Sequence, residues 1–329
     1  IEGMAEILAV TFPFFALVLA GYLATRWRWL PIESIPGLNT FVLYFALPCL
    51  LYRFGSSTPI AQLLDVPLFL MYLFCAMLMV GFVVMVSRNQ RVGWNDASFG
   101  ALVAAFPNTG FMGVPLLVAL LGASSAGPAI VSIVVDLLFT SSLCIALSRL
   151  DGADEHGAGK AARQALKGVM VNPMPWAIVL GAVSSAQQVK WPAPVDKTLS
   201  LLADAASPVA LFTIGAVLAR SALRAQSSDS GTLPKTLPLR DYVPVAFIKL
   251  LVHPCLVLLV GTTAMQWGVR IDPFALMVVT LVAALPSASN VALLSERFGA
   301  DTGRIARIIL LSTAASFLTF SALVAVLRA

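Results

Sequence analysis

The chain has 329 residues, of which 59% are hydrophobic and 11% are charged, and its formal net charge is +5. Soluble domains carry roughly 25% charged residues, so this composition excludes a water-soluble fold and predicts an integral membrane protein with many spans. The basic residues lie in short loops between apolar runs, so the positive charge does not indicate nucleic-acid binding.

Ten apolar runs are candidates for membrane spans, each of which needs about 20 apolar residues. The sixth is short, and the fourth and ninth are interrupted by proline and small polar residues. We expect Met4 to be the native first residue, and the first run, which has no basic segment or cleavage site beside it, to be a retained span. In chain order the runs are Ala5–Thr25, Leu38–Phe54, Pro67–Ser87, Ala97–Leu121, Pro128–Ser148, Pro173–Ala186, Val195–Ala219, Val243–Met265, Pro273–Glu296 and Ile305–Leu327.

Lysine and arginine are divided unevenly between the loops on the two sides of these spans. Fifteen fall on one side and five on the other, while Lys249 lies inside a span. Because the more positive side faces the cytoplasm, both termini are predicted to face outward. The sequence therefore predicts a multi-pass protein of the inner (plasma) membrane.

Two polar stretches on the cytoplasmic side divide the chain. Residues 151–168 are rich in Gly and Ala and mixed in charge, which is typical of a flexible linker. They separate residues 1–150 from residues 169–329, and each half holds five predicted spans. Residues 225–240 are rich in Ser, Asp, Gly and Pro and are predicted to be an inserted loop.

The two halves repeat. Pro48 in the second span has a partner in Pro208 in the seventh, 160 residues later. Pro107 in the fourth span has a partner in Pro286 in the ninth, 179 residues later, and the extra 19 residues are close to the length of the inserted loop. Five spans are an odd number, so the halves have opposite orientations. The predicted fold class is all-α, with ten transmembrane helices in two inverted five-helix repeats, which is typical of a secondary-transporter core.

The fourth and ninth spans break near their middles. Each proline follows the start of its span by 13 residues, which at about 1.5 Å per residue places both breaks near the bilayer centre. The spans run in opposite directions, so the breaks can cross there. Each second half-helix then points its positively polarised N-terminus at the crossing, as in anion sites. The alternative is a pair of structural kinks. The candidate substrate-binding residues are Pro107, Asn108, Thr109, Gly110, Pro286, Ser287, Ser289 and Asn290.

Two of these residues take special positions. Asn108 and Ser287 follow the two prolines, where helix N-caps belong. Their side chains can satisfy the free N–H groups of an empty site or hold a ligand directly.

Asp136 is a charged residue within the fifth span, where charge is costly and usually functional. Ser132, Asp136 and Thr140 share one helical face. Ser312, Ser316 and Thr319 in the tenth span have similar spacing, and both stripes are expected to face the bundle interior. Asp136 is a candidate proton carrier or cation ligand, and the alternative is a structural acid.

Three further ionisable residues are candidates for coupling to an ion. Lys249 and His253 lie one turn apart in the eighth span. Lys249 either extends along the helix to the cytoplasmic surface or attracts an anionic substrate, and His253 either packs or relays protons. Asp204 is either a second intramembrane acid or a residue near the outer surface.

Other chemistry lacks support in the sequence. The four cysteines and two histidines have no metal-ligand or redox spacing, and no ATP-binding loop or hydrolase motif occurs. No cofactor is expected beyond a coupling proton or sodium ion. The rival functions are a channel, a sensor and an intramembrane hydrolase that pairs Asp136 with Asp204.

Three segments carry a resemblance to a known family. Residues 108–115 (Asn-Thr-Gly-Phe-Met-Gly-Val-Pro) resemble the fourth-span motif of the auxin efflux carrier family, which includes the plant PIN proteins and compact bacterial malonate-type carriers. Residues 286–290, followed by 298–301, resemble its ninth-span motif, and residues 39–48 resemble its second span. The likeness covers all ten predicted spans.

The resemblance implies a fold shared with bile-acid/sodium symporters and sodium/proton antiporters. Spans 1, 2, 6 and 7 would form a scaffold, and spans 3–5 and 8–10 a transport domain that moves as an elevator. It also implies small organic anions as substrates, a homodimer, and leading substrate roles for Asn108 and Asn290. The sodium-site acids of the symporters have no clear match here. The predicted function is secondary transport of small carboxylates across a lipid bilayer, without an enzymatic reaction.

Overall fold

The computed structural model describes residues 2–89, 91–150, 173–227 and 238–328, together with residues 163, 167, 170 and 171. Across these residues the regular secondary structure is helical, and seven helices are long and apolar enough to cross a membrane. The prediction of an all-helical, multi-pass protein is therefore confirmed. Most of the predicted linker, residues 151–168, and of the predicted inserted loop, residues 225–240, lies outside the described residues.

The seven long helical segments coincide with predicted spans. Three of them contain short π-helical turns, labelled η here, between α-helical parts. The seven are α1 (Glu2–Arg26), α2–η2–α3 (Ile35–Phe41, Val42–Ala46 and Leu47–Ser57), α5 (Val66–Ser87), α8–η5–α9 (Ala126–Val135, Asp136–Thr140 and Ser141–Leu147), α12 (Ala193–Ser227), α13–η8–α14 (Val243–Phe247, Ile248–Val252 and His253–Gln266) and α17 (Thr302–Arg328).

Shorter helices occupy the other three predicted ranges. The fourth range holds α6 (Trp94–Ala105), then η3 (Thr109–Gly113) and α7 (Val114–Leu121) after a break. The sixth holds α11 (Pro173–Gln187). The ninth holds α15 (Pro273–Ala283) and, after a second break, α16 (Asn290–Arg297). Both predicted interruptions are therefore present.

Proline accounts for most of the π-helical turns. The turns η2, η3 and η8 each end two residues before a proline, at Pro48, Pro115 and Pro254. Proline has no N–H, and its ring clashes with the carbonyl group four residues earlier. The preceding turn widens, and such turns recur at functional sites. The fourth turn, η5, begins at Asp136, whose carbonyl oxygen accepts a hydrogen bond from the Ser141 hydroxyl at 2.8 Å.

The seventh span was predicted to end at Ala219, but α12 continues to Ser227. The prediction ended the span where the apolar run ends. Residues 220–227 contain no glycine or proline and include good helix formers, so the helix continues beyond the apolar zone. The first residues of the predicted inserted loop are therefore helical.

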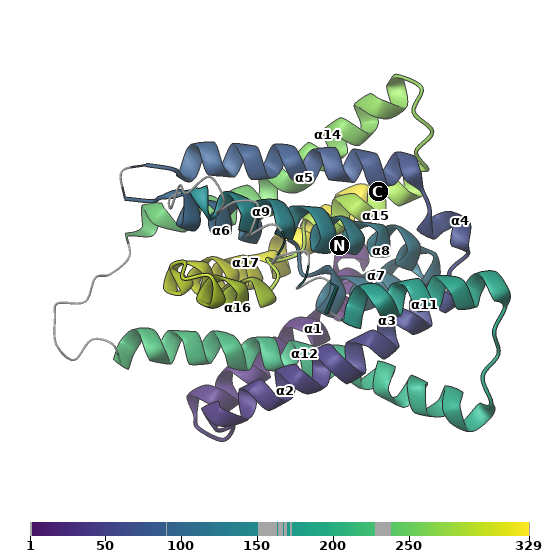
Figure 1. The fold of residues 1–329 in the computed structure, drawn as a ribbon, viewed down its shortest axis with the longest axis horizontal. Helices are drawn as coiled ribbons and strands as arrows, with labels where there is room; N and C mark the ends of the chain where they lie inside the picture. The colour runs from purple at the N-terminus through teal and green to yellow at the C-terminus, as the bar shows by residue number, and fades with distance from the viewer. Residues whose placement is uncertain are drawn as a thin grey trace.

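Helices α1, α2, α3, α11 and α12 lie together on one side of the molecule, as Figure 1 shows. Here α1 packs against α12, and α3 packs against α11. A Cβ atom added at Gly21 of α1 would lie 1.8 Å from a backbone oxygen of α12, and one at Gly215 of α12 would lie 1.8 Å from a backbone oxygen of α1. Gly55 of α3 and Gly181 of α11 approach each other in the same way, with Cβ–backbone separations of 3.2 and 2.8 Å. These close contacts require glycine.

The remaining helices form a second group around α15 and the two breaks. Within it, α5 packs against α6 and α14, and α15 packs against α14 and α8. Helix α17 contacts both groups, because it packs against α1 and α12 on one side and α13 and α16 on the other. The two breaks therefore lie inside the bundle.

Candidate functional site

The two breaks cross and are joined through their backbones. Pro107 and Ser287 form an isolated antiparallel bridge. The Asn108 N–H donates to the Pro286 carbonyl at 2.8 Å, and the Ala288 N–H donates to the Phe106 carbonyl at 2.9 Å. In a bilayer, irregular backbone must find its hydrogen-bond partners within the protein or a water-filled cavity. The bridge supplies some of these hydrogen bonds, so the two breaks stabilise each other.

Both second half-helices begin at the crossing. On the first side, the earliest helical hydrogen bonds run from the N–H groups of Met112 and Gly113 to the Asn108 carbonyl. On the second, the Val291 N–H donates to the Ala288 carbonyl at 3.3 Å and the Ala292 N–H to the Ser289 carbonyl at 3.2 Å. The N–H groups before these bonds lie in the first turn of each half-helix, where helical geometry leaves donors without an intrahelical acceptor. The positively polarised N-termini of two half-helices therefore meet at the crossing, inside the bundle.

Unpaired amide oxygens mark the crossing on both sides. Asn108 is 4% exposed, and its Oδ1 atom is buried without a hydrogen-bond partner. The Oδ1 atom of Asn290 is also buried without a partner. Leaving a buried polar atom unpaired costs about 1–3 kcal/mol. Two such atoms lie beside the crossing, one on each interrupted segment.

The predicted capping roles are corrected by the structure. Asn108 occupies the N-cap position of η3, but its side chain makes no capping hydrogen bond. Ser287 does not occupy an N-cap, because α16 begins only at Asn290. The backbone around Ser287 is extended by the bridge, which delays the helix. Its N–H donates to the Ser312 Oγ atom at 3.2 Å, and the Ser312 hydroxyl donates to the Ser287 hydroxyl at 3.2 Å.

The other predicted binding residues also lie at the crossing. Thr109 is fully buried, and Ser289 is 8% exposed. A Cβ atom added at Gly113 would lie 2.4 Å from the Cδ1 atom of Leu285, so glycine permits the two breaks to approach. Gly110 is turned toward Leu47 of α3, where an added Cβ atom would lie 3.9 Å from its Cδ2 atom. The crossing therefore borders the second span.

Asp136 lies in a polar cluster inside the second helix group. Its side chain is fully buried and accepts hydrogen bonds from the Tyr72 hydroxyl at 3.3 Å and from the Thr140 hydroxyl at 3.0 Å. Ser132 and Ser316 are also fully buried, so the predicted inward direction of both polar stripes holds at these positions. Both carboxylate oxygens of Asp136 have donors.

Lys249 belongs to the same region, and of its two predicted alternatives the extension to the cytoplasmic surface is wrong. The side chain is fully buried. Its Nζ atom donates to the carbonyl oxygen of Ala283 at 2.5 Å and lies 3.2 Å from the Nδ1 atom of His253. The His253 ring lies 6.4 Å from the Tyr72 ring, and its Nε2 atom is buried without a partner. Lys249 is directed at the end of α15 because that helix stops there and leaves carbonyl groups free.

Asp204 lies apart from this cluster, on the surface. Its carboxylate is 66% exposed and pairs with Arg53 at 2.6 Å. This exposed, ion-paired position counts against a buried intramembrane acid. It also contradicts the hydrolase hypothesis, because that hypothesis needs Asp204 beside the fully buried Asp136.

Sequence reasoning missed Tyr72. It is fully buried in the apolar helix α5, and it is the donor that links α5 to Asp136. A signal was available, because a buried tyrosine hydroxyl usually needs a polar partner. The partner itself could not be read from the sequence.

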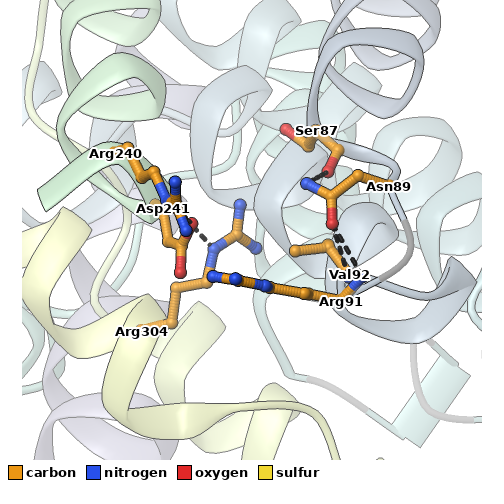
Figure 2. Close-up of polar contacts among 7 residues, drawn as sticks. All are labelled: Ser87, Asn89, Arg91, Val92, Arg240, Asp241 and Arg304. Atoms are coloured by element: carbon orange, nitrogen blue, oxygen red, sulfur yellow. Dashed lines mark hydrogen bonds and ion pairs between the residues drawn. The ribbon is translucent and has the colours of Figure 1, made fainter. Parts of the chain in front are cut away.

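The far ends of the site helices are held together by Arg304, at the start of α17. Its side chain donates to the carbonyl oxygens of Asp241 at 2.7 Å and Asp96 at 2.8 Å, which ties α17 to the starts of α13 and α6. Figure 2 shows this contact with Asp241 and the neighbouring loop, in which Asn89 Oδ1 accepts from the Arg91 and Val92 N–H groups. These contacts fix the ends of the helices that lead to the crossing.

Comparison with known proteins identifies the family. Residues 7–324 match the family model described as membrane transport protein. The chain belongs to this family. It is 28% identical over 331 residues to a Rhizobium meliloti (strain 1021) protein named "Putative malonate transporter". The match covers 99% of this chain and 97% of that protein. It is 27% identical over 303 residues to "Uncharacterized transporter YfdV" of Escherichia coli (strain K12), covering 88% of each.

A plant relative links the chain to the auxin carriers. The chain is 22% identical over 266 residues to "Auxin efflux carrier component 8" of Arabidopsis thaliana, covering 65% of this chain and 72% of that protein. The resemblance to the auxin efflux carrier family is therefore confirmed. Together with the apolar helices, these matches make the protein a multi-pass membrane transporter, and the names of its relatives indicate a transporter rather than an enzyme.

Proposed function

We propose that this membrane transport protein is a secondary transporter of small organic anions, which bind at the crossing. One observation carries the proposal. Two broken spans meet in a backbone bridge, and beside it lie two helix N-termini and the unpaired side-chain oxygens of Asn108 and Asn290. An asparagine amide presents either its oxygen or its NH₂ group after rotation. A carboxylate would accept hydrogen bonds from the two NH₂ groups and the free N–H groups of the helix ends.

The proposed substrate class is a mono- or dicarboxylate. The name of the Rhizobium meliloti relative specifies malonate, a dianion with two carboxylates. A crossing with two helix N-termini provides one positively polarised end for each carboxylate of such a molecule. Malonate is therefore the first substrate to test.

We also propose the inverted-repeat architecture, with repeats in residues 1–150 and 169–329. The matched breaks support it, as do the matched glycine contacts. One contact joins the first and seventh spans through Gly21 and Gly215, and the other joins the sixth and second through Gly181 and Gly55. Exchange of the two halves converts one pair into the other, as an inverted repeat requires.

The two helix groups of Figure 1 suggest how alternating access would work. Helices α1–α3, α11 and α12 would form the scaffold, and the helices of spans 3–5 and 8–10 would carry the crossing past it as an elevator. The scaffold would also form the homodimer, with both termini outside the inner membrane. A Cβ atom added at Gly110 would lie 3.9 Å from Leu47, which supports a sliding surface beside the substrate.

Asp136 is the proposed coupling residue for a proton or a sodium ion, with Lys249 and His253 as its neighbours. Its full burial supports this role, because an intramembrane acid is expensive unless it functions. The test is the Asp136→Asn variant in proteoliposomes. It should remove the dependence of malonate flux on pH or on sodium. A variant that keeps the dependence would place the coupling elsewhere.

The substrate site is tested with radiolabelled malonate and purified protein in proteoliposomes. Wild-type protein should show saturable flux. Asn108→Ala and Asn290→Ala should each lower it by about 10-fold or more, since each removes a hydrogen bond to a charged group. Gln187→Ala, an exposed amide at the end of α11, is the matched control and should leave the flux unchanged. Wild-type flux in both asparagine variants would refute the site, and non-saturable conduction would support a channel.

A further inference from the structure

Lys249 occupies an unusual place for a lysine. Its side chain is fully buried inside the helix group that contains the crossing. Burying an ammonium group is expensive unless it is paired and hydrogen-bonded. Its two close contacts are the Ala283 carbonyl oxygen, at 2.5 Å, and the Nδ1 atom of His253, at 3.2 Å. The first contact explains the burial.

Ala283 is the last residue of α15, so the ammonium group lies at the C-terminus of a half-helix. The last carbonyl groups of a helix have no intrahelical donor and carry the negative end of the helix dipole. In most proteins these groups reach water, but α15 ends inside the bundle. Lys249 supplies both the missing donor and the opposite charge.

This end of α15 is directly connected to the site. Only Ala284 and Leu285 separate Ala283 from Pro286, whose carbonyl oxygen accepts the Asn108 N–H at 2.8 Å. A shift at Ala283 would therefore move the bridge. Lys249 lies behind the crossing and touches none of its binding residues in the described contacts, so its effect on substrate would be indirect.

The groups that face Lys249 come from several helices. His253 lies on its own span, Asp136 lies on η5, and Tyr72 on α5 donates to Asp136 and lies beside the His253 ring. Asp136 is the acidic group that acts electrostatically on Lys249, and as a carboxylate it would balance the ammonium charge. Tyr72 and Lys249 are also each the seventh residue of their helical segments, which begin at Val66 and Val243. The matching position in the first half thus holds a neutral phenol.

We infer that Lys249 is the positioning residue of the crossing: its ammonium group holds the end of α15 and thereby sets the geometry of the substrate site. The inference rests on the proposed function, because it concerns the same site. The ammonium charge is needed at Lys249, beside the end of α15. The matching residue in the first half, Tyr72 on α5, carries no such charge. An uncharged side chain of similar length would leave the Ala283 carbonyl free and loosen the break.

The test combines malonate flux with hydrogen–deuterium exchange of the purified full-length protein. In Lys249→Met, the backbone amides of residues 283–288 should exchange at least about 10-fold faster than in wild-type protein. Malonate flux should fall by a similar factor, which is the loss expected for one hydrogen bond to a charged group. Lys249→Arg, which keeps the charge, should stay closer to wild type in both measurements. Lys197→Met, an exposed lysine of α12, is the matched control and should change neither.

A second variant covers the case in which Lys249→Met does not fold. Lys249→Ala leaves space for a small amine, so methylammonium should restore its flux and its exchange protection, while choline, which has no N–H donor, should not. Wild-type flux and protection in Lys249→Met would overturn the inference. Failure of methylammonium to restore Lys249→Ala would also count against it. Absence of saturable flux in wild-type protein would instead refute the proposed function.

Discussion

The close approach of the two breaks gives a sharp prediction at Gly113. An alanine Cβ atom there would lie 2.4 Å from the Cδ1 atom of Leu285, whereas carbon atoms pack best at about 3.5–4.0 Å. Leu285 is fully buried, so it cannot turn into open space. Overpacking of this kind typically costs about 1–3 kcal/mol.

Helix propensity acts in the opposite direction and must be subtracted. Alanine is favoured over glycine in a helix by about 0.5–1 kcal/mol, and Gly113 lies in η3. The net destabilisation of Gly113→Ala is therefore about 0–2.5 kcal/mol. Because Leu285 precedes Pro286, the displaced side chain should also move the bridge and reduce malonate flux.

A double-mutant cycle isolates this contact. Leu285→Ala alone should cost about 2–5 kcal/mol through its cavity. The double variant should be less destabilised than the sum of the two single variants, by about 1–2 kcal/mol, because the contact that strains Gly113→Ala has been removed. The free energies come from reversible unfolding in detergent. The control is Gly81→Ala in α5, where no atom lies within 4 Å of the added Cβ and the change should be neutral or stabilising. Additive effects would refute the reasoning.

The remaining predictions concern other contacts. Gly21→Ala and Gly215→Ala should each destabilise the protein by at least about 3 kcal/mol in the same unfolding measurement, because the added atom meets backbone that cannot rotate away, at 1.8 Å. Asp204→Asn should cost less than about 1 kcal/mol and leave malonate flux unchanged, since its ion pair with Arg53 is exposed. Arg304→Lys should cost about 1–3 kcal/mol of unfolding free energy, because one ammonium group cannot reproduce the planar fork that reaches the carbonyls of Asp96 and Asp241.

The breaks could be predicted from the sequence because their causes are local. Pro107 and Pro286 interrupt apolar runs, and a proline removes a helical hydrogen bond wherever it lies. The start of α16 could not be predicted in this way. Ser287 pairs with Pro107 across the bridge, and that tertiary contact delays the helix to Asn290.

The polar cluster was only partly predictable, because side-chain direction depends on packing. The spacing of Ser132, Asp136 and Thr140 placed them on one face, and Thr140 does bond to Asp136. Nothing in the sequence distinguishes a lysine that extends to the surface from one that caps a helix inside the bundle. Lys249 caps a helix inside the bundle because α15 ends beside it. Tyr72 was missed for a similar reason, since its partner lies 64 residues away.

The charges of the cluster bear on how an anion would bind at the crossing. Asp136 and Lys249 are both fully buried, and as a pair of opposite charges they would leave no net charge to balance a carboxylate in this low-dielectric region. The helix ends and the asparagine amides supply only partial charges. An added anion is therefore best accommodated if the Asp136 carboxylate takes up a proton, which leaves the charge of Lys249 to balance the substrate.

Malonate binding should accordingly be accompanied by proton uptake at Asp136. Titration calorimetry in buffers of different ionisation enthalpy measures the protons taken up per malonate bound. We expect net uptake in wild-type protein and its loss in Asp136→Asn, in which the positive charge of Lys249 is already unopposed, so this variant should still bind malonate. Equal uptake in the two proteins would mean that another group receives the proton. Absence of uptake in wild-type protein would mean that the helix ends and amides balance the carboxylate by themselves.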